Sequence, residues 1–264
     1  MADAAGEEWK TYDDFAHGID TYRKANVSLA GTSLSIIFGK RAAIDLNFLD
    51  DSSVEWSASG GIVAAAGTVD PYDAVQVREG VFFINLPLTS RERESITIVF
   101  TRKTNRAIIA YSVIAAERVE GTPQVSQQFW AGTTNEGDAS GNKPGESRDL
   151  IGMRNIYRYS PNHLYEHVYV SSQRYAWQCL EGAQRGHGDM DLSTVWKLDD
   201  GLYLFCFREF RISVASVWLH DLGYGLNTTG VFLGISAAGE SMHSRAGGYI
   251  YPLGTVRYPD AQPI

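Results

Sequence analysis

Residues 54–61 read VEWSASGG, and residues 175–182 read YAWQCLEG. When the first stretch is laid on the second, tryptophan falls on tryptophan and the final glycine on glycine. The register continues without a gap from about residue 44 to residue 86, at a constant separation of 121 positions. Five identities follow it: Trp56 with Trp177, Gly61 with Gly182, Gly67 with Gly188, Asp70 with Asp191, and Gly80 with Gly201. A fixed separation of this kind indicates an internal repeat, and a repeat determines the fold.

Both copies consist of short segments rich in β-branched and aromatic residues. These segments alternate with polar residues and stop at Gly, Asp-Gly or Asn, which is typical of β-strands joined by tight turns. They occupy residues 33–114 in the first copy and 164–235 in the second. Antiparallel strands in such numbers must pack as a sandwich or close on themselves to remove exposed edges. We predict an all-β fold of antiparallel barrels built from two related halves, either two small barrels or one larger shared barrel.

The pattern divides the chain into five parts. A helix is expected near the N-terminus, and two loop-like regions are rich in Gly, Ser, Thr, Asn, Tyr and Pro. The expected parts are an N-terminal helical segment 1–27, a first half 28–116, a linker 117–149, a second half with the pocket 150–236, and a tail 237–264.

Composition and charge exclude several classes of function. The chain has 264 residues and a net charge of −8, whereas nucleic-acid binding needs a basic face. No apolar run approaches the roughly 20 residues that cross a bilayer, and the acidic N-terminus lacks the features of a secretory signal. We expect a cytoplasmic protein without nucleic-acid or membrane partners. A homodimer is left open.

The repeat also shows which face of each strand points inward. In the first copy Ile44, Leu46 and Phe48 are apolar and alternate with polar residues, so they face the core. The matching positions of the second copy are Tyr165, His167 and Tyr169. We therefore expect a Tyr-His-Tyr face inside the second half.

Other core positions of the first copy also change into aromatic or polar residues in the second. Burying an unpaired polar group costs roughly 1–3 kcal/mol, so such an interior needs internal hydrogen bonds, waters or a ligand. Aromatic walls with a few convergent polar groups are typical of a small-molecule pocket. The expected substrate-binding residues are Trp177, Tyr175, Trp196, Tyr203, Phe205, Phe207 and His220.

The stretches NHLYEHVYVSSQRYAWQCLEG (162–182) and DDGLYLFCFRE (199–209) resemble the molybdenum cofactor biosynthesis protein F (MoaF-like) family. The resemblance implies a calycin (lipocalin-like) antiparallel barrel in each half. It implies no particular reaction, and cofactor biosynthesis is not carried over. Related barrels include phenolic acid decarboxylases and allene oxide cyclases, which is an analogy of fold alone.

The expected catalytic residues are the polar groups of this interior. An imidazole exchanges protons near neutral pH, so His167 would move a proton while Tyr165 and Tyr169 stabilise an oxyanion. Glu209, which replaces Leu88, would assist with a pKa raised by apolar walls, unless it pairs with a neighbouring arginine. Arg208 would hold a substrate oxygen, although strand alternation places it on the opposite face from Glu209.

No metal or cofactor is predicted. The loop HGDMD (187–191) holds metal-ligand residue types but no third histidine nearby, and no nucleotide-binding motif is present. The leading hypothesis is a cofactor-independent lyase, hydratase, isomerase or cyclase that acts on a small hydrophobic or aromatic molecule, polyketide- or terpenoid-like. The alternatives are a lipocalin-like binding protein without turnover, and an interaction module whose interior polar groups satisfy one another.

Overall fold

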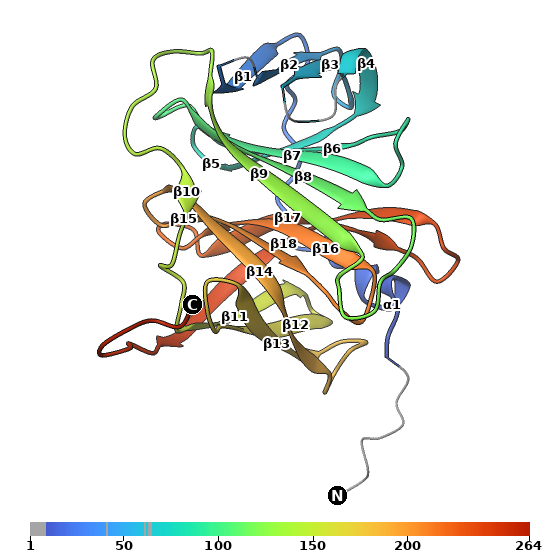
Figure 1. The fold of residues 1–264 in the computed structure, drawn as a ribbon, viewed down its shortest axis with the longest axis vertical. Coiled ribbons are helices and arrows are strands. Elements are labelled where there is room, and N and C mark those ends of the chain that lie inside the picture. The colour runs from blue at the N-terminus through green and yellow to red at the C-terminus, as the bar shows by residue number, and fades with distance from the viewer. Residues whose placement is uncertain (1–8, 41, 61, 63–64) are drawn as a thin grey trace, which may run out of the picture.

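The computed structural model describes residues 9–40, 42–60, 62 and 65–264 and is almost entirely β-structure (Figure 1). Its elements, in chain order, are α1 (Tyr12–Ala16), β1 (Ser33–Gly39), β2 (Ala42–Phe48), β3 (Ser53–Ser59), β4 (Ala65–Pro71), β5 (Asp73–Arg78), β6 (Val81–Pro87), β7 (Glu94–Thr101), β8 (Arg106–Ile114), β9 (Val125–Thr134), β10 (Gly145–Glu146), β11 (Met153–Ser160), β12 (His163–Tyr169), β13 (Arg174–Glu181), β14 (Gly188–Asp199), β15 (Leu202–Arg208), β16 (Val214–Asp221), β17 (Asn227–Ile235) and β18 (Ser241–Thr255).

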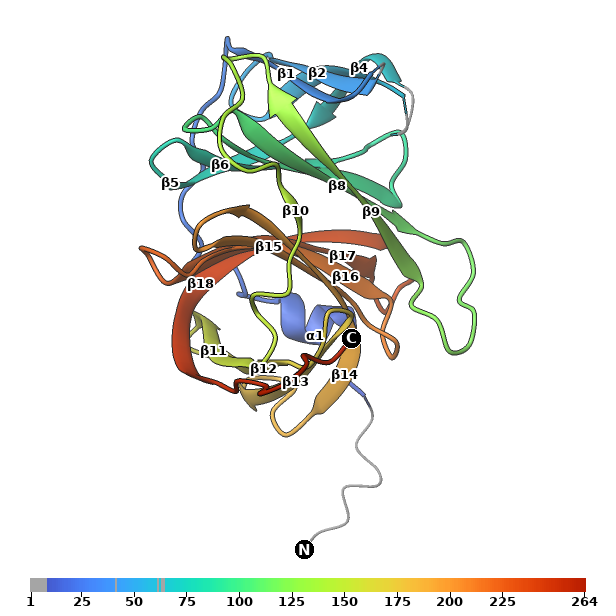
Figure 2. The same cartoon turned by 60° about the vertical axis from the view of Figure 1, so that its left-hand side comes forward.

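The strands form two antiparallel, barrel-like sheets, one from each half of the chain (Figures 1 and 2). The first follows the order β4-β3-β2-β1-β9-β8-β7-β6-β5 and is nearly closed. The second closes fully, because β14 pairs with both β13 and β15. The prediction of an all-β fold with two related halves is confirmed, and the halves form two barrels rather than one.

One strand explains why the two sheets close differently. β14 runs unbroken, with its first residues paired to β13 and the rest to β15. The corresponding part of the first half is interrupted at Tyr72, which divides it into β4 and β5. Pro71 precedes the break and has no N–H to donate to a ladder. The first barrel therefore remains open along this line.

The repeat is reproduced at the level of single hydrogen bonds. The indole Nε1 of Trp56 donates to Asp70 Oδ2 at 2.8 Å, and Nε1 of Trp177 donates to Asp191 Oδ2 at 2.9 Å. In both halves the other carboxylate oxygen accepts a backbone N–H located 19 residues further along the chain. Each aspartate thus links its own strand to the preceding strand and to the segment that follows β6 or β15. The conserved spacing of these pairs has a structural cause, and their side chains are not free for chemistry.

The paired glycines Gly80 and Gly201 occupy equivalent turns. Both have positive φ, 71° and 69°, in the tight connections that lead into β6 and β15. A residue with a Cβ is strained in this region, so glycine is required twice for the same reason. Gly61, another identity of the repeat, lies outside the described residues.

The two barrels pack through equivalent outer faces. Val77, Val81 and Phe83 of the first barrel meet Leu198 and other apolar residues of the second in one buried cluster. Cys206 is buried there as a free thiol.

A salt bridge accompanies this packing. The Arg78 guanidinium lies 3.4 Å from the Asp199 carboxylate, and the two residues are 121 positions apart. The interface therefore joins the same position of each copy, as in a two-fold symmetric dimer.

Two segments differ from the sequence reading. Residues 125–134, expected in the linker, form β9, which pairs with β1 and β8. Residues 241–255, expected in an irregular tail, form β18, which pairs with β11 and β17 and closes the second barrel. Both segments lack clean alternation because glycine and polar residues interrupt them. Their neighbours in the barrels, rather than local pattern, determine their strand conformation.

The expected N-terminal helix is present but short. α1 begins with a capping box in which the Thr11 backbone N–H donates to Asp14 Oδ2 at 2.7 Å. None of the helices in the described part of the chain is long and apolar enough to span a bilayer.

The Trp–Asp pairs predict a matched loss of stability in the two halves. Asp70→Ala and Asp191→Ala each leave a buried indole N–H and a backbone N–H without an acceptor. Each should lower the free energy of unfolding by about 2–4 kcal/mol in urea titrations. Asp260→Ala, at an exposed position, should change it by less than about 0.5 kcal/mol. Changes below that limit at both buried positions would contradict the structural role.

Candidate functional site

The Tyr-His-Tyr face points into the second barrel. Tyr165, His167 and Tyr169 are 7%, 4% and 2% exposed, and both tyrosines belong to the barrel's interior cluster. Their counterparts Ile44, Leu46 and Phe48 lie in the apolar core of the first barrel. The same strand position is therefore buried in both copies, with different chemistry.

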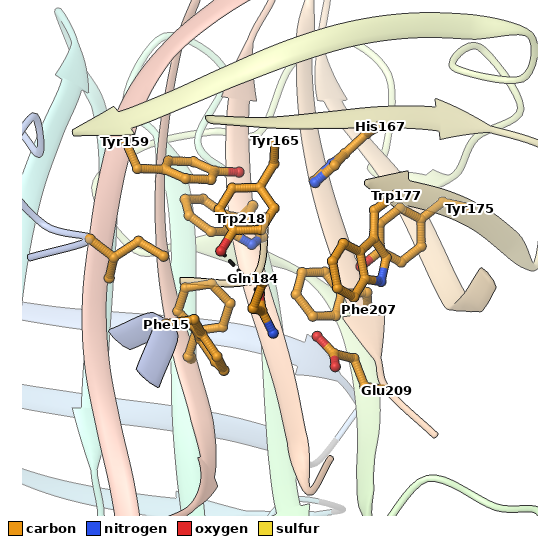
Figure 3. A pocket seen from close by; sticks show the side chains of 12 residues that line it. Phe15, Tyr159, Tyr165, His167, Tyr175, Trp177, Gln184, Phe207, Glu209 and Trp218 are labelled. Atoms are coloured by element: carbon orange, nitrogen blue, oxygen red, sulfur yellow. Dashed lines mark hydrogen bonds between the residues drawn. The ribbon is translucent and has the colours of Figure 1, made fainter. Parts of the chain in front are cut away.

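The second barrel holds a small cavity of about 30 Å³ beside this face (Figure 3). A cavity of this size has room for one or two water molecules. Its walls come from six strands of the barrel, the turn after β13, the residue after β15 and the N-terminal segment. The lining residues are Phe15, Ile19, Tyr159, Tyr165, His167, Tyr175, Trp177, Gln184, Phe207, Glu209, Trp218 and Phe232.

Several polar groups of the lining have no hydrogen-bond partner. His167 Nδ1, Gln184 Nε2 and Trp218 Nε1 are all buried and unpaired within the described residues. Leaving a buried donor or acceptor unpaired costs about 1–3 kcal/mol. Three residues that line one cavity therefore carry polar atoms that the described residues leave unpaired.

The carboxyl group of Glu209 is a fourth unsatisfied group of this lining. It is 7% exposed, and no described residue forms a hydrogen bond or ion pair with it. Burial raises the pKa of this carboxyl well above its usual range, and the nearby carboxylates Asp191 and Asp189 raise it further. Its counterpart Leu88 is an ordinary core residue of the first barrel. Glu209 therefore holds its proton at pH values where an exposed glutamate is ionised.

The His167 imidazole is neutral over the physiological range. Burial lowers its pKa to about 3, against a smaller raising effect from Glu166 on the outer face of the same strand. The ring packs between Tyr157, Tyr175 and Phe205 at centroid distances of 4.5–5.9 Å. In Figure 3 His167 and Glu209 approach the cavity from opposite sides. The expected proton transfer by His167 would thus begin from the uncharged imidazole.

Gln184 is held in the cavity wall by its own turn and by Tyr165. The Tyr165 hydroxyl donates to Gln184 Oε1 at 3.0 Å, which leaves the amide Nε2 facing inward (Figure 3). The turn starts at Gly182, where φ is 127° and a Cβ would lie 2.5 Å from the Asn162 carbonyl oxygen. Glycine is required at this position, and the required turn places Gln184.

Tyr169 belongs to a separate hydrogen-bond chain inside the barrel. Its hydroxyl lies 2.6 Å from the Tyr157 hydroxyl and 3.1 Å from His220 Nε2. His220 Nδ1 lies 2.8 Å from Thr228 Oγ1, and Asn155 Nδ2 donates to Tyr157. Burial lowers the pKa of His220 well below its usual value. These groups largely satisfy one another's hydrogen bonds. Tyr169 is therefore a weaker candidate than Tyr165 for contact with a ligand.

Of the other expected binding residues, some line the cavity and some lie elsewhere. The rings of Tyr175, Trp177 and Phe207 line the cavity, whereas Phe205 belongs to the same interior cluster without lining it. The Tyr203 hydroxyl donates to Asp149 Oδ2 at 2.9 Å instead.

Two expected site residues face the first barrel. Trp196 packs in the cluster between the barrels, with its ring 6.1 Å from that of Phe129. The guanidinium of Arg208 donates to Gln127 of the first barrel and to Thr194, each at 3.1 Å. Strand alternation had placed Arg208 opposite Glu209, and that is where it lies.

The N-terminal segment covers the mouth of the cavity. Phe15 and Ile19 form part of the lining. Before α1, the Trp9 ring stacks on His187 at 4.9 Å, and the Arg211 guanidinium lies 4.6 Å from the Trp9 ring. A molecule larger than one or two waters therefore needs this segment to move aside.

The sequence reading missed half of the lining. Tyr159 corresponds to Phe38 at the same separation of 121, so carrying the repeat further back would have found it. Phe15, Ile19 and Gln184 lie outside the strand pattern, and no signal in the sequence singles them out. Over the described residues, no three His, Cys, Asp or Glu side chains are grouped to hold a metal ion.

Comparisons with known proteins agree with this two-barrel organisation. Residues 7–116 match the model of the MoaF N-terminal domain, and residues 144–256 match the model of the MoaF C-terminal domain. The chain belongs to the MoaF family. Protein MoaF of Klebsiella aerogenes is 32% identical over 194 residues, which cover 70% of each chain. A solved chain named as a beta-lactamase candidate from Burkholderia vietnamiensis has 15% identity and a TM-score of 0.34, covering 39% of this chain and 95% of that one.

The unpaired Glu209 predicts a pH-dependent loss of stability. Because its pKa is raised in the folded state, its favourable contribution is present below the unfolded value of about 4.3 and is lost as pH rises through the folded value. Glu209→Leu, which restores the residue type of the first barrel, should raise the free energy of unfolding by about 1–3 kcal/mol at neutral pH.

Urea titrations at pH 4 and pH 8 test this expectation. The gain should be larger at pH 8, while Glu120→Leu on an exposed loop should change stability by less than about 0.5 kcal/mol at both pH values. A gain that is the same at both pH values would mean that Glu209 is not held protonated by burial.

Proposed function

We propose that the interior of the second barrel binds a small, largely aromatic molecule and exchanges a proton with it, as a lyase or isomerase does. The observation that supports this most strongly is the set of unpaired polar groups on the cavity. His167 Nδ1, Gln184 Nε2, Trp218 Nε1 and the Glu209 carboxyl all border the same space between aromatic rings. A bound molecule with polar atoms would satisfy them together.

In this proposal Glu209 is the proton donor. A carboxyl kept protonated by burial can pass its proton to a basic oxygen, nitrogen or carbon of the substrate, and the resulting carboxylate takes a proton back from another substrate atom. Neutral His167 and Gln184 orient the substrate by hydrogen bonds, and Tyr165 holds Gln184 in place. The aromatic rings exclude water from the reacting atoms.

Binding without turnover is the second candidate. It is favoured by the low pKa of His167, about 3, which makes the imidazole a weak base in the ligand-free barrel. The cover formed by the N-terminal segment also suits slow capture and release. In this case the same polar groups fix the orientation of the ligand and no bond changes.

Deuterium exchange distinguishes the candidates without knowledge of the substrate. The purified protein is first analysed by native mass spectrometry for a retained small molecule. It is then titrated with a panel of small aromatic compounds while the Trp indole N–H signals are followed by NMR. Compounds that bind are incubated with the protein in D₂O, and mass spectrometry measures deuterium at their carbon-bound positions.

Glu209→Gln keeps the shape of the side chain and removes its proton. We expect the variant to bind uncharged compounds within a few-fold of the original protein and to exchange them about 100-fold more slowly or worse, the usual effect of losing a general acid. Glu120→Gln is the matched control and should change neither value. Binding with no exchange by the original protein supports the carrier, and no binding of any compound in the barrel refutes the proposed site.

A further inference from the structure

We propose that the ligand of this cavity is a cation: a small amine that carries a flat apolar group and is held as an ammonium ion by Glu209 and the surrounding rings. The inference rests on the proposed function, because it takes the same cavity as a ligand site. It goes further in assigning the charge and chemical class of the ligand.

The charge around the cavity has one sign. None of the twelve lining residues is a lysine or an arginine, and Glu209 has no positive partner among the described residues. The neighbouring carboxylate of Asp191 is buried and accepts hydrogen bonds from uncharged donors. Asp189 pairs with Arg211 at 2.6 Å outside the lining. A ligand entering this cavity thus meets one carboxyl group, that of Glu209, and no lysine or arginine in the lining.

The walls suit a cation as well. Eight of the twelve lining residues are Phe, Tyr or Trp. The faces of aromatic rings carry partial negative charge and attract ammonium groups, and aromatic cages are the usual binding sites for such ligands. In Figure 3 the rings of Trp177, Tyr175 and Phe207 lie between Glu209 and His167. One carboxyl group within a ring of aromatics supplies both attractions that hold an amine.

Ligands of other charge fit less well. An anion would find no lysine or arginine in the lining to pair with. A neutral molecule could accept the Glu209 proton in a hydrogen bond but would gain nothing from the negative surroundings. An amine converts the unpaired carboxyl into half of an ion pair, which is shielded from water by the rings.

The proton balance of binding is simple. A free amine that enters the cavity takes the proton of Glu209: the carboxyl O–H bond breaks, an N–H bond forms, and ammonium and carboxylate remain paired. An amine that arrives already protonated requires Glu209 to release its proton to solvent. Both routes end in the same complex, and the second releases one proton.

Burial raises the pKa of Asp191, next to Glu209, to about 6, and its carboxylate accepts hydrogen bonds from Trp177 and Phe210. Asp189 and Arg211 pair with each other. His167 is neutral, and the tyrosine pKa values are raised by burial. The groups that face Glu209 or its neighbours are Asp189 and Asp191 on β14, Tyr165 and His167 on β12, Tyr175 on β13, and Arg211 after β15.

The test compares one ring in three charge states. Benzylamine, benzyl alcohol and benzoate are titrated into the full chain by calorimetry at neutral pH. We expect benzylamine to bind at least about tenfold more tightly than benzyl alcohol, and benzoate not to bind, because each charge-assisted contact in a dry site strengthens binding by such a factor. Two buffers of different ionisation enthalpy should report release of up to one proton with benzylamine.

Variants then test whether Glu209 is the group that pairs with the ammonium ion. Glu209→Gln should lose the preference for benzylamine, with a fall of about tenfold or more in its affinity, and should bind benzyl alcohol within about threefold of the original protein. Glu120→Gln should keep the preference. Thermal unfolding of each variant verifies that it is folded before the titrations are compared.

The outcomes separate this inference from the proposed function. If benzyl alcohol binds as tightly as benzylamine and shifts the indole signals of the barrel, the cavity is a ligand site but the assignment of its ligand as an amine is wrong. Undiminished benzylamine binding by Glu209→Gln also overturns the inference. If no compound, charged or neutral, perturbs the barrel interior, the proposed function and this inference both fail.

Discussion

A small antiparallel barrel must fill its own interior with side chains, and the rest of this structure depends on how each half meets that requirement. The first barrel fills the space with aliphatic and aromatic residues such as Ile44, Leu46 and Leu88. The second places aromatic and polar side chains such as Tyr165, His167 and Glu209 at the matching positions. The space that they leave is the cavity, and its unpaired groups follow from the same exchange. Site and scaffold are therefore two solutions to one packing problem.

The backbone that both halves share explains why the differences concentrate at inward positions. The Trp–Asp hydrogen bond is retained in each barrel, and Gly80 and Gly201 make the same turn. The outer faces are also constrained, because equivalent surfaces pack against each other and Arg78 pairs with Asp199 across them. Because the turns and the interface are constrained in both copies, the inward positions are free to differ. The two copies differ there.

Most of what the sequence predicted follows the repeat, and most of what it missed does not; Tyr159, the counterpart of Phe38, is an exception. A comparison of the copies identified the inward face of β12 and the exchange of Leu88 for Glu209, because both depend on strand alternation and a fixed separation. It could not identify β18, whose three glycines and one proline hide its alternation and whose pairing comes from distant strands. Gln184 depends on a turn, and the cover over the cavity depends on a helix of five residues. Neither segment is long enough to show a periodic pattern in the sequence. Arg208 lies on the face away from the cavity, as alternation indicated, so the structure does not bring it to the site where it was expected to hold a substrate oxygen.

Burial, more than residue type, determines whether His167 or Glu209 carries a proton that a ligand could take. In water an imidazole titrates near neutrality and a carboxyl does not, so the sequence favours histidine as the group that moves a proton. Inside this barrel neither group has an opposite charge beside it. Burial therefore favours the neutral form of both, lowering the pKa of His167 to about 3 and raising that of Glu209. A neutral imidazole has already given up its acidic proton, whereas a neutral carboxyl group still carries one. The proton available to a ligand thus belongs to Glu209, and its transfer would create the negative charge that the site can pair with a cation.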